Sequence, residues 1–204
     1  MNDLILVRHG ESLWNKKGLW TGLIDVGLSQ KGIEESKKAG ENLKDFRIDI
    51  AYTSLLKRAK DTLSIIKKTL NIPNIPIIEN KALNERDYGE LTGKNKWDIE
   101  KKFGKEKFLK IRRAWNFPIP FGETLRDVYN RVVPYYKFEI LPKLKTGKNV
   151  ILVAHGNSLR ALVKYLENIS DEDISKLELA TGEIYIYKLD KQGKIVSKQI
   201  KTIN

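Results

Sequence analysis

The two histidines of this chain lie in matching sequence surroundings. His9 follows the apolar run Leu4–Val7 with Arg8 between them, and His155 follows the apolar run 150–154 directly. A glycine comes after each histidine. Such runs are typical of buried parallel strands, and the residues just past the carboxyl ends of parallel strands share one edge of the sheet. We therefore expect the two imidazoles to meet in one pocket, the alternative being two unrelated loop histidines.

The neighbours of these histidines favour an anionic ligand. Arg8 adjoins His9, and Arg58 stands near the start of a later helix. Arginine binds phosphate bidentately, and glycines let backbone N–H groups approach phosphate oxygens. A neutral imidazole is a competent nucleophile, so the pattern predicts phosphoryl transfer to a histidine. A metal site is disfavoured, because two histidines without cysteine would need carboxylates to complete it.

The elements that would position these residues alternate between strands and helices. This alternation predicts an α/β fold with a mostly parallel sheet flanked by helices. Expected strands are 4–7, 48–52, 77–79, 149–154, 183–189 and 195–200, the last two joined by a turn at 190–193. Expected helices are 30–43 after Ser29, one capped by Thr53 and Ser54 and running to about Leu70, 124–141 with a kink at Pro134, and 159–166.

The segment from about 83 to 122 is more polar and aromatic than the rest and carries arginines. We expect it to form one or two helices, 97–103 and 105–115, as an excursion above the sheet. The whole chain, 1–204, is interpreted as a single domain.

Composition narrows the functional classes. The formal net charge is +12, which attracts anions such as a phosphorylated metabolite or a nucleic acid. The lysines are scattered, and no nucleic-acid motif is found, so nucleic-acid binding remains a remote alternative. There is no cysteine, signal peptide or membrane-spanning apolar run, and we expect a cytoplasmic protein without a membrane partner.

Short motifs over nearly the whole chain give a family resemblance. Leu6–Ser12, Trp14-Asn15, Thr21-Gly22, Ala51–Ser54 and Leu56–Ala59 are similar to the histidine phosphatase superfamily. More discriminating are Leu83–Arg86, Tyr88-Gly89, Leu91, Gly93, Asn95-Lys96, Arg112-Arg113 and Ala154–Arg160. With these the chain resembles the phosphoglycerate mutases that depend on 2,3-bisphosphoglycerate and use no metal, and dimers are common in that family.

The resemblance implies roles for individual residues. His9 would be the phosphorylated nucleophile, and Glu85 the general acid and base. Arg8, Arg58 and His155 would hold the transferring phosphoryl group. The expected substrate-binding residues are Ser12, Asn15, Thr21, Gly22, Arg86, Tyr88, Lys96, Arg112, Arg113, Gly156 and Asn157. Of these, Tyr88, Lys96, Arg112 and Arg113 would grip the carboxylate and the second phosphate of an intermediate with two phosphates.

The chain departs from that family's pattern at three places. The connection 118–125 is short, as in simpler phosphatases of the superfamily, and the chain ends at Asn204 without the longer tail of some relatives. Asp87 stands where relatives often have histidine. The resemblance implies interconversion of 2-phosphoglycerate and 3-phosphoglycerate, primed by 2,3-bisphosphoglycerate, in glycolysis and gluconeogenesis. The alternative is a phosphatase acting on small phosphomonoesters with the same His9.

Overall fold

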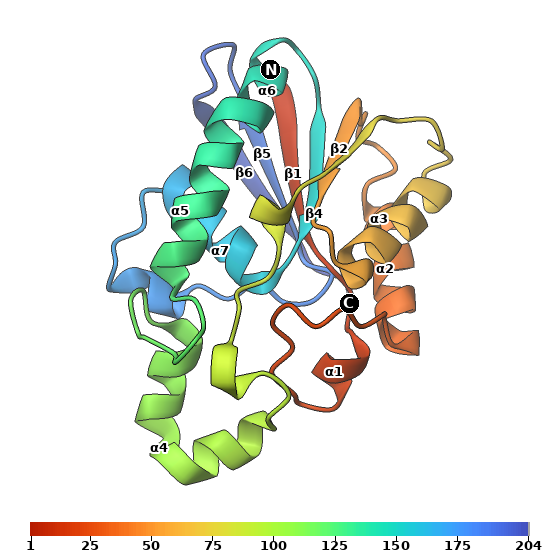
Figure 1. Ribbon diagram of the computed structural model, residues 1–204. Coiled ribbons are helices and arrows are strands. Elements are labelled where there is room, and N and C mark those ends of the chain that lie inside the picture. The colour runs from red at the N-terminus through yellow and green to blue at the C-terminus, as the bar shows by residue number, and fades with distance from the viewer. Residues whose placement is uncertain (204) are drawn as a thin grey trace.

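A six-stranded sheet runs through the centre of the molecule (Figure 1). The computed structural model describes residues 1–203. The strands are β1 (Asn2–Arg8), β2 (Ile50–Thr53), β3 (Ile77–Glu79), β4 (Val150–Ala154), β5 (Ile184–Leu189) and β6 (Ile195–Lys201), in the spatial order β3-β2-β4-β1-β5-β6. The first four are mutually parallel, whereas β5 and β6 are antiparallel additions at one edge. The expected mostly parallel α/β fold is confirmed.

Helices cover both faces of this sheet (Figure 1). The α-helices are α1 (Leu13–Lys16), α2 (Gln30–Asn42), α3 (Lys57–Thr69), α4 (Lys96–Arg113), α5 (Leu125–Tyr135), α6 (Leu141–Lys145) and α7 (Gly156–Leu166). Side chains of a strand alternate between its faces. Accordingly Leu4 and Leu6 of β1 pack in the cluster under α5 and α7, whereas Ile5 and Val7 pack in the cluster under α2 and α3. This two-sided burial explains the continuous apolar runs.

The register of β1 against β4 brings the two histidine-bearing strand ends together. Arg8 pairs with Ala154, and the backbone N–H of His9 donates to the carbonyl of Ala154 at 3.0 Å. The histidines, 146 positions apart in sequence, therefore leave the sheet side by side at its carboxyl edge.

The excursion lies beyond that edge and has a small apolar core of its own. It contains the 3₁₀ turns Lys81–Leu83 and Gly89–Leu91 and then α4. Trp20 packs there with Phe108, at 6.1 Å between ring centroids, and with Ile111. The two helices expected here are present within α4, which is interrupted at Gly104, whose φ of 78° breaks the helical backbone between them.

Several expected boundaries are wrong. Thr53 belongs to β2 and Ser54 does not cap a helix, because α3 begins only at Lys57. α1 lies between the expected strand 4–7 and the expected helix 30–43, where no helix was predicted. α7 begins at Gly156, three residues before the expected start. Pro134 lies inside α5, and the expected irregularity follows it as a π-helical stretch, Tyr136–Ile140, leading into α6.

None of the helices within residues 1–203 is both long and apolar enough to span a bilayer. The assignment of 1–204 to one domain stays a prediction.

Candidate active site

His9 is held with one ring nitrogen fixed. Its Nδ1 lies 2.7 Å from the carbonyl oxygen of Gly10, so this nitrogen carries the proton and donates it. Nε2 is then the unprotonated nitrogen. Burial lowers the pKa of His9 well below its usual value, and the positive charges of Arg58 and Arg8 lower it further. The ring is therefore neutral at physiological pH, as a nitrogen nucleophile must be.

His155 lies directly beside His9. The ring centroids are 4.9 Å apart, with the planes inclined at 63°. Nε2 of His155 is 2.7 Å from the hydroxyl oxygen of Ser54, which stands just past the end of β2. Burial, then the charge of Arg58, lowers the pKa of His155 as well. Ser54, expected as a helix cap, instead orients this second imidazole.

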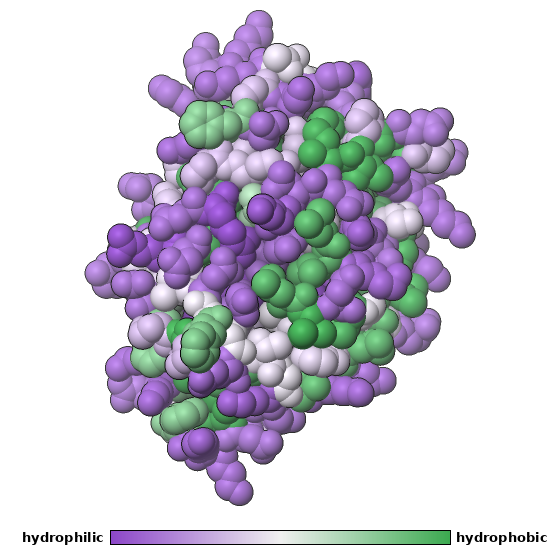
Figure 2. Space-filling view, viewed as in Figure 1, coloured by the Kyte–Doolittle hydropathy of each residue, from purple (hydrophilic) through white to green (hydrophobic). Residues whose placement is uncertain are grey.

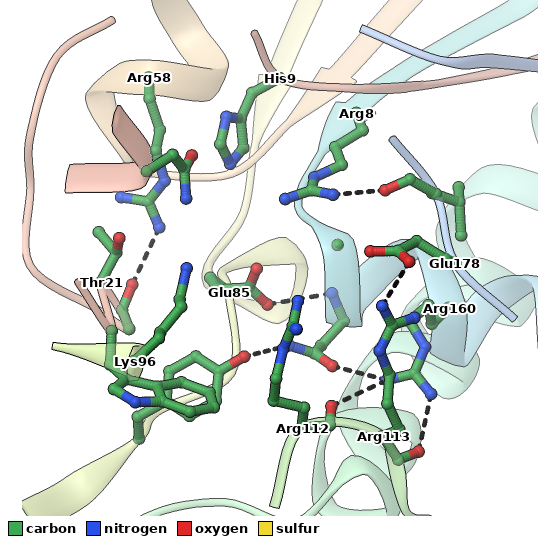
Figure 3. Close-up of a pocket in the computed structure, with 17 residues that line it drawn as sticks. Arg8, His9, Thr21, Arg58, Glu85, Lys96, Arg112, Arg113, Arg160 and Glu178 are labelled. Atoms are coloured by element: carbon green, nitrogen blue, oxygen red, sulfur yellow. Dashed lines mark hydrogen bonds and ion pairs between the residues drawn. The ribbon is translucent and has the colours of Figure 1, made fainter. Parts of the chain in front are cut away.

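Arg58 and Arg8 lie on either side of His9 (Figure 3). Arg58 is 1% exposed, and its guanidinium donates to the carbonyls of Gly22 at 2.9 Å and Ile24 at 3.0 Å. These bonds orient the charge and also fix the loop before α2. Arg8 donates through Nη1 to the carbonyl of Leu179. Its buried Nε has no partner among the described residues, so the guanidinium retains an unused donor.

Glu85 places a carboxylate in the same pocket. Its Oε1 accepts the backbone N–H groups of Arg86 at 2.8 Å and Asn157 at 3.1 Å. Asn157 lies in the first turn of α7, where unpaired N–H groups and the helix dipole favour a negative charge. The side chain is 9% exposed. A carboxyl group so placed has the geometry of a proton donor and acceptor for a bound ligand.

Further cations lie on the side of the pocket away from His9 (Figure 3). Lys96, at the start of α4, and Arg112 and Arg113, at its end, all line the pocket. Burial, reinforced by the charges of Arg112 and Arg8, lowers the pKa of Lys96 to about 8. Arg113 Nη2 lies 2.5 Å from Oε2 of Glu178.

A hydrogen-bond chain joins this side of the pocket to α7. The side-chain N–H of Asn157 donates to the Tyr88 hydroxyl oxygen at 2.8 Å, while Asn157 Oδ1 accepts from Arg160 at 3.0 Å. Arg160 also donates to the carbonyl of Arg113 at 2.8 Å. The end of α4 is thereby tied to the helix that follows His155.

Most of the predicted site residues line one pocket: Arg8, His9, Asn15, Thr21, Gly22, Arg58, Glu85, Tyr88, Lys96, Arg112, Arg113, Gly156 and Asn157. Ser12, Arg86 and His155 do not. Ser12 is fully buried and caps α1, accepting the backbone N–H of Asn15 at 3.1 Å. The guanidinium of Arg86 turns away from the pocket to the carbonyls of Glu123 and Ile111. His155 is fully buried, with its ring centroid 4.9 Å from that of His9.

Four lining residues were not predicted as site residues: Trp20, Arg160, Glu178 and Leu179. Arg160 belongs to the motif after His155, so its position was a usable signal. Glu178 and Leu179 carry no local signal, because only the return of the chain into β5 brings them to the pocket. In total five arginines and one lysine face two glutamates, which makes the pocket strongly cationic.

Comparison with known proteins gives consistent matches. Residues 4–201 match the family model described as histidine phosphatase superfamily (branch 1). A 2,3-bisphosphoglycerate-dependent phosphoglycerate mutase of Chelativorans is 51% identical over 199 residues, covering 97% of each chain. A phosphoglycerate mutase of Schizosaccharomyces pombe is 49% identical over 201 residues, covering 98% of this chain and 95% of the relative.

Solved structures share the fold. Bacillus stearothermophilus YhfR aligns with a TM-score of 0.83 at 25% identity, covering 96% of this chain and 94% of its own. A mycobacterial glucosyl-3-phosphoglycerate phosphatase aligns with a TM-score of 0.82 at 19% identity, covering 99% and 98% of the two chains.

Proposed function

The chain belongs to the histidine phosphatase superfamily, and we propose that it is a 2,3-bisphosphoglycerate-dependent phosphoglycerate mutase. The reaction interconverts 2-phosphoglycerate and 3-phosphoglycerate through phosphorylated His9. Enzymes with this activity serve glycolysis and gluconeogenesis, and we propose a cytoplasmic location. Identity of 47–51% over nearly the full length of relatives with that name supports the assignment.

The observation that carries the proposal is the presence of cations on two sides of one pocket. Arg8 and Arg58 flank His9, whereas Lys96, Arg112 and Arg113 lie away from it (Figure 3). Transfer of one phosphoryl group needs only the first set. Retention of a ligand with two phosphates, or with a phosphate and a carboxylate, requires counter-charges at the second position as well.

His9 would attack phosphorus through Nε2, since Nδ1 is committed to the Gly10 carbonyl. Arg8 and Arg58 would neutralise the equatorial oxygens as the phosphoryl group moves. His155 does not itself line the pocket, but its ring centroid lies 4.9 Å from that of His9, and from there it would add a donor to the same oxygens.

Glu85 would exchange a proton with the hydroxyl oxygen of glycerate. Phosphoryl transfer to His9 leaves an alkoxide, which the protonated carboxyl group neutralises. In the reverse direction the carboxylate takes the proton from the attacking hydroxyl. Its position near the first turn of α7 supports this role.

The polar groups of the pocket fit 2,3-bisphosphoglycerate. The buried Arg8 Nε and Thr21 Oγ1 have no hydrogen-bond partner within residues 1–203, and both belong to residues that line the pocket. Buried polar groups are normally paired, so these two donors suit ligand oxygens. When bound, 2,3-bisphosphoglycerate supplies the phosphoryl group that primes His9. Lys96, Arg112 and Arg113 would hold the phosphate that is not transferred.

A coupled assay of conversion of 3-phosphoglycerate to 2-phosphoglycerate tests the proposal. The assay contains EDTA and is run with and without trace 2,3-bisphosphoglycerate, on the wild type and on His9→Ala. We expect turnover that bisphosphoglycerate stimulates, that EDTA leaves intact, and that the variant lacks. Release of inorganic phosphate without conversion would identify a phosphatase instead, and absence of both activities would refute phosphoryl chemistry at His9.

A further inference from the structure

Glu85 lies in a segment that belongs to neither the sheet nor an α-helix. Residues 84–88 have no regular secondary structure between the two 3₁₀ turns of the excursion. The position of the Glu85 carboxyl group therefore depends on what holds the backbone on either side of it.

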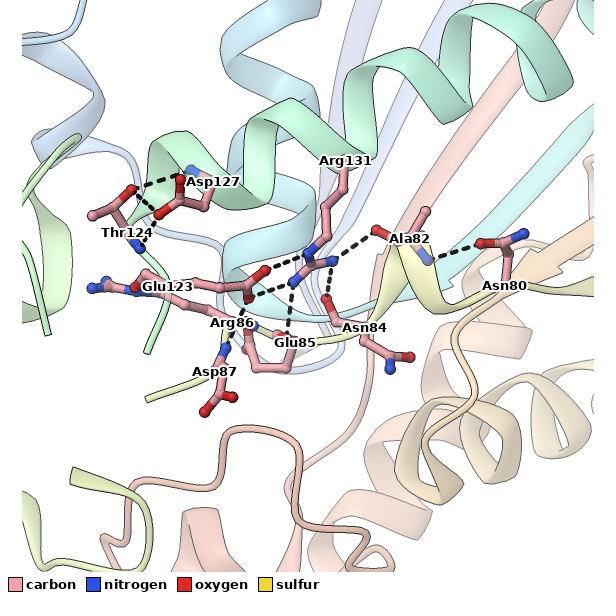
Figure 4. Close-up of polar contacts among 10 residues, drawn as sticks. All are labelled: Asn80, Ala82, Asn84, Glu85, Arg86, Asp87, Glu123, Thr124, Asp127 and Arg131. Atoms are coloured by element: carbon pink, nitrogen blue, oxygen red, sulfur yellow. Dashed lines mark hydrogen bonds and ion pairs between the residues drawn. The ribbon is translucent and has the colours of Figure 1, made fainter. Parts of the chain in front are cut away.

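Arg131, on α5, binds this backbone through its guanidinium group (Figure 4). Nη1 donates to the carbonyls of Ala82 at 2.8 Å and Asn84 at 2.9 Å, and Nη2 donates to the carbonyl of Glu85 at 3.0 Å. Nε and Nη2 also bind the two carboxylate oxygens of Glu123 at 2.8 and 2.9 Å. These five bonds use every N–H that a guanidinium has.

Glu123 completes the attachment on the other side of Glu85. Its Oε2 accepts the backbone N–H of Asp87 at 2.9 Å, and its own backbone N–H donates to the Asp87 carbonyl at 2.9 Å. The Glu123 carbonyl accepts from Arg86 Nε at 2.5 Å. The ion pair therefore fixes backbone groups before, at and after Glu85.

We infer that Arg131 and Glu123 form a clamp that positions the Glu85 carboxyl group for proton transfer. Neither residue lines the pocket, so both are positioning residues and not catalytic residues. Rates are sensitive to displacement, since an error of about 1 Å in the position of a reacting group costs on the order of a hundredfold. The inference rests on the proposed function, in which Glu85 protonates the leaving oxygen.

The chemistry of the leaving group separates this role from a general contribution to the fold. When phosphorus bonds to His9 Nε2, the P–O bond breaks and its electron pair stays on the leaving oxygen. An alkoxide then needs a proton from Glu85, whereas p-nitrophenolate is stable without one. A misplaced Glu85 should therefore slow transfer from alkyl phosphates and spare transfer from p-nitrophenyl phosphate.

The experiment measures single-turnover phosphorylation of His9 by 2,3-bisphosphoglycerate, glycerol 3-phosphate and p-nitrophenyl phosphate. The variants are Arg131→Gln and the nearly isosteric Glu123→Gln, with Glu85→Gln as reference. Arg126→Gln, an exposed arginine on the same helix, is the matched control. For both clamp variants we expect alkyl-phosphate rates to fall by about tenfold to a hundredfold, as in Glu85→Gln, with the p-nitrophenyl phosphate rate within about threefold of wild type.

Two results would overturn the clamp. Equal loss with all donors would mean that the pair only supports the fold, and unchanged rates would mean that it does not position Glu85. The wild type tests the proposed function separately. If that function is wrong, glycerol 3-phosphate will phosphorylate His9 of the wild type and 2,3-bisphosphoglycerate will not. In that case the clamp is still judged on the remaining two donors.

Discussion

The carboxylate of Glu178 forms an ion pair with Arg113 inside the pocket that we assign to an anionic substrate, with 2.5 Å between Oε2 and Nη2. Burial raises the pKa of Glu178, but the hydrogen bond and the charge of Arg113 outweigh it and hold the pKa below its usual value. Glu178 is therefore ionised at neutral pH. A ligand phosphate or carboxylate that binds Arg113 has to compete with this internal anion.

Replacing Glu178 with glutamine should strengthen ligand binding. Glu178→Gln keeps the size of the side chain but removes the competing charge. Because the Glu178 side chain is 59% exposed and solvent screens the pair, we expect a modest effect, a Kd for 3-phosphoglycerate lower by about two- to five-fold. Titration calorimetry measures it. Glu172→Gln makes the same charge change at an exposed position outside the pocket and should leave Kd nearly unchanged. Weaker binding in Glu178→Gln would show that the carboxylate helps to hold the ligand.

The charge of Lys96 should give substrate binding an alkaline limit. Its pKa of about 8 means that the ammonium group is present below that pH and lost above it. We expect KM for 3-phosphoglycerate to rise as the pH passes from about 7.5 to 9.5, because Lys96 then loses its charge. In Lys96→Arg, whose guanidinium stays charged, the rise should disappear. Lys94→Arg, at an exposed position two residues away, should retain it. A KM in the wild type that does not change over this range would contradict a ligand-binding Lys96 that loses its charge near pH 8.

Much of the site could be predicted because strand ends in a parallel sheet are geometrically constrained. The two continuous apolar runs predict the strands β1 and β4. The pairing of Arg8 with Ala154 in these strands then places His9 beside His155. The helices on both faces followed from the same burial. These are the features for which local pattern and global topology agree.

The other site residues could not be predicted, because their side-chain directions depend on backbone conformation outside helices and strands. Glu85 and Arg86 are adjacent, yet one side chain enters the pocket and the other binds the carbonyls of Glu123 and Ile111. No periodicity governs such a segment, so the sequence could not distinguish them. Ser12 was predicted to bind substrate, but it satisfies the first turn of α1, a role that serine performs equally well. Glu178 reaches the pocket only through tertiary contacts.

Close contact between α2 and the loop after His9 predicts the effect of a mutation at Gly32. Alanine normally favours a helix over glycine by about 1 kcal/mol. Here a Cβ on residue 32 would lie 2.0 Å from the backbone carbonyl oxygen of Glu11, which belongs to the loop that follows His9. We therefore expect Gly32→Ala to destabilise the fold by about 1–3 kcal/mol and to lower kcat, because the loop must move. Urea unfolding and the mutase assay measure the two effects.

Lys38→Ala, at an exposed position on the same helix, is the control for Gly32→Ala and should change stability by less than about 0.5 kcal/mol. If Gly32→Ala instead stabilised the protein, as helix propensity alone predicts, the contact between α2 and the loop would leave room for a Cβ.

The buried histidine pair should make the protein less stable in mild acid. Burial and the nearby arginines lower the pKa of both His9 and His155 in the folded state, whereas in the unfolded chain each has a pKa of about 6.5. As the pH falls below about 6.5 the unfolded state therefore takes up protons that the folded state does not, and stability decreases. For two such groups we expect the free energy of unfolding to fall by about 2–3 kcal/mol between pH 7.5 and 5.5.

Urea titrations at a series of pH values measure this change in the free energy of unfolding with pH. The double variant His9→Asn, His155→Gln has no imidazole in either state, so its free energy of unfolding should change much less with pH. If the double variant keeps the full pH dependence of the wild type, other groups cause it. The pKa values of the two folded-state imidazoles are then not lowered as argued from their burial and the nearby arginines.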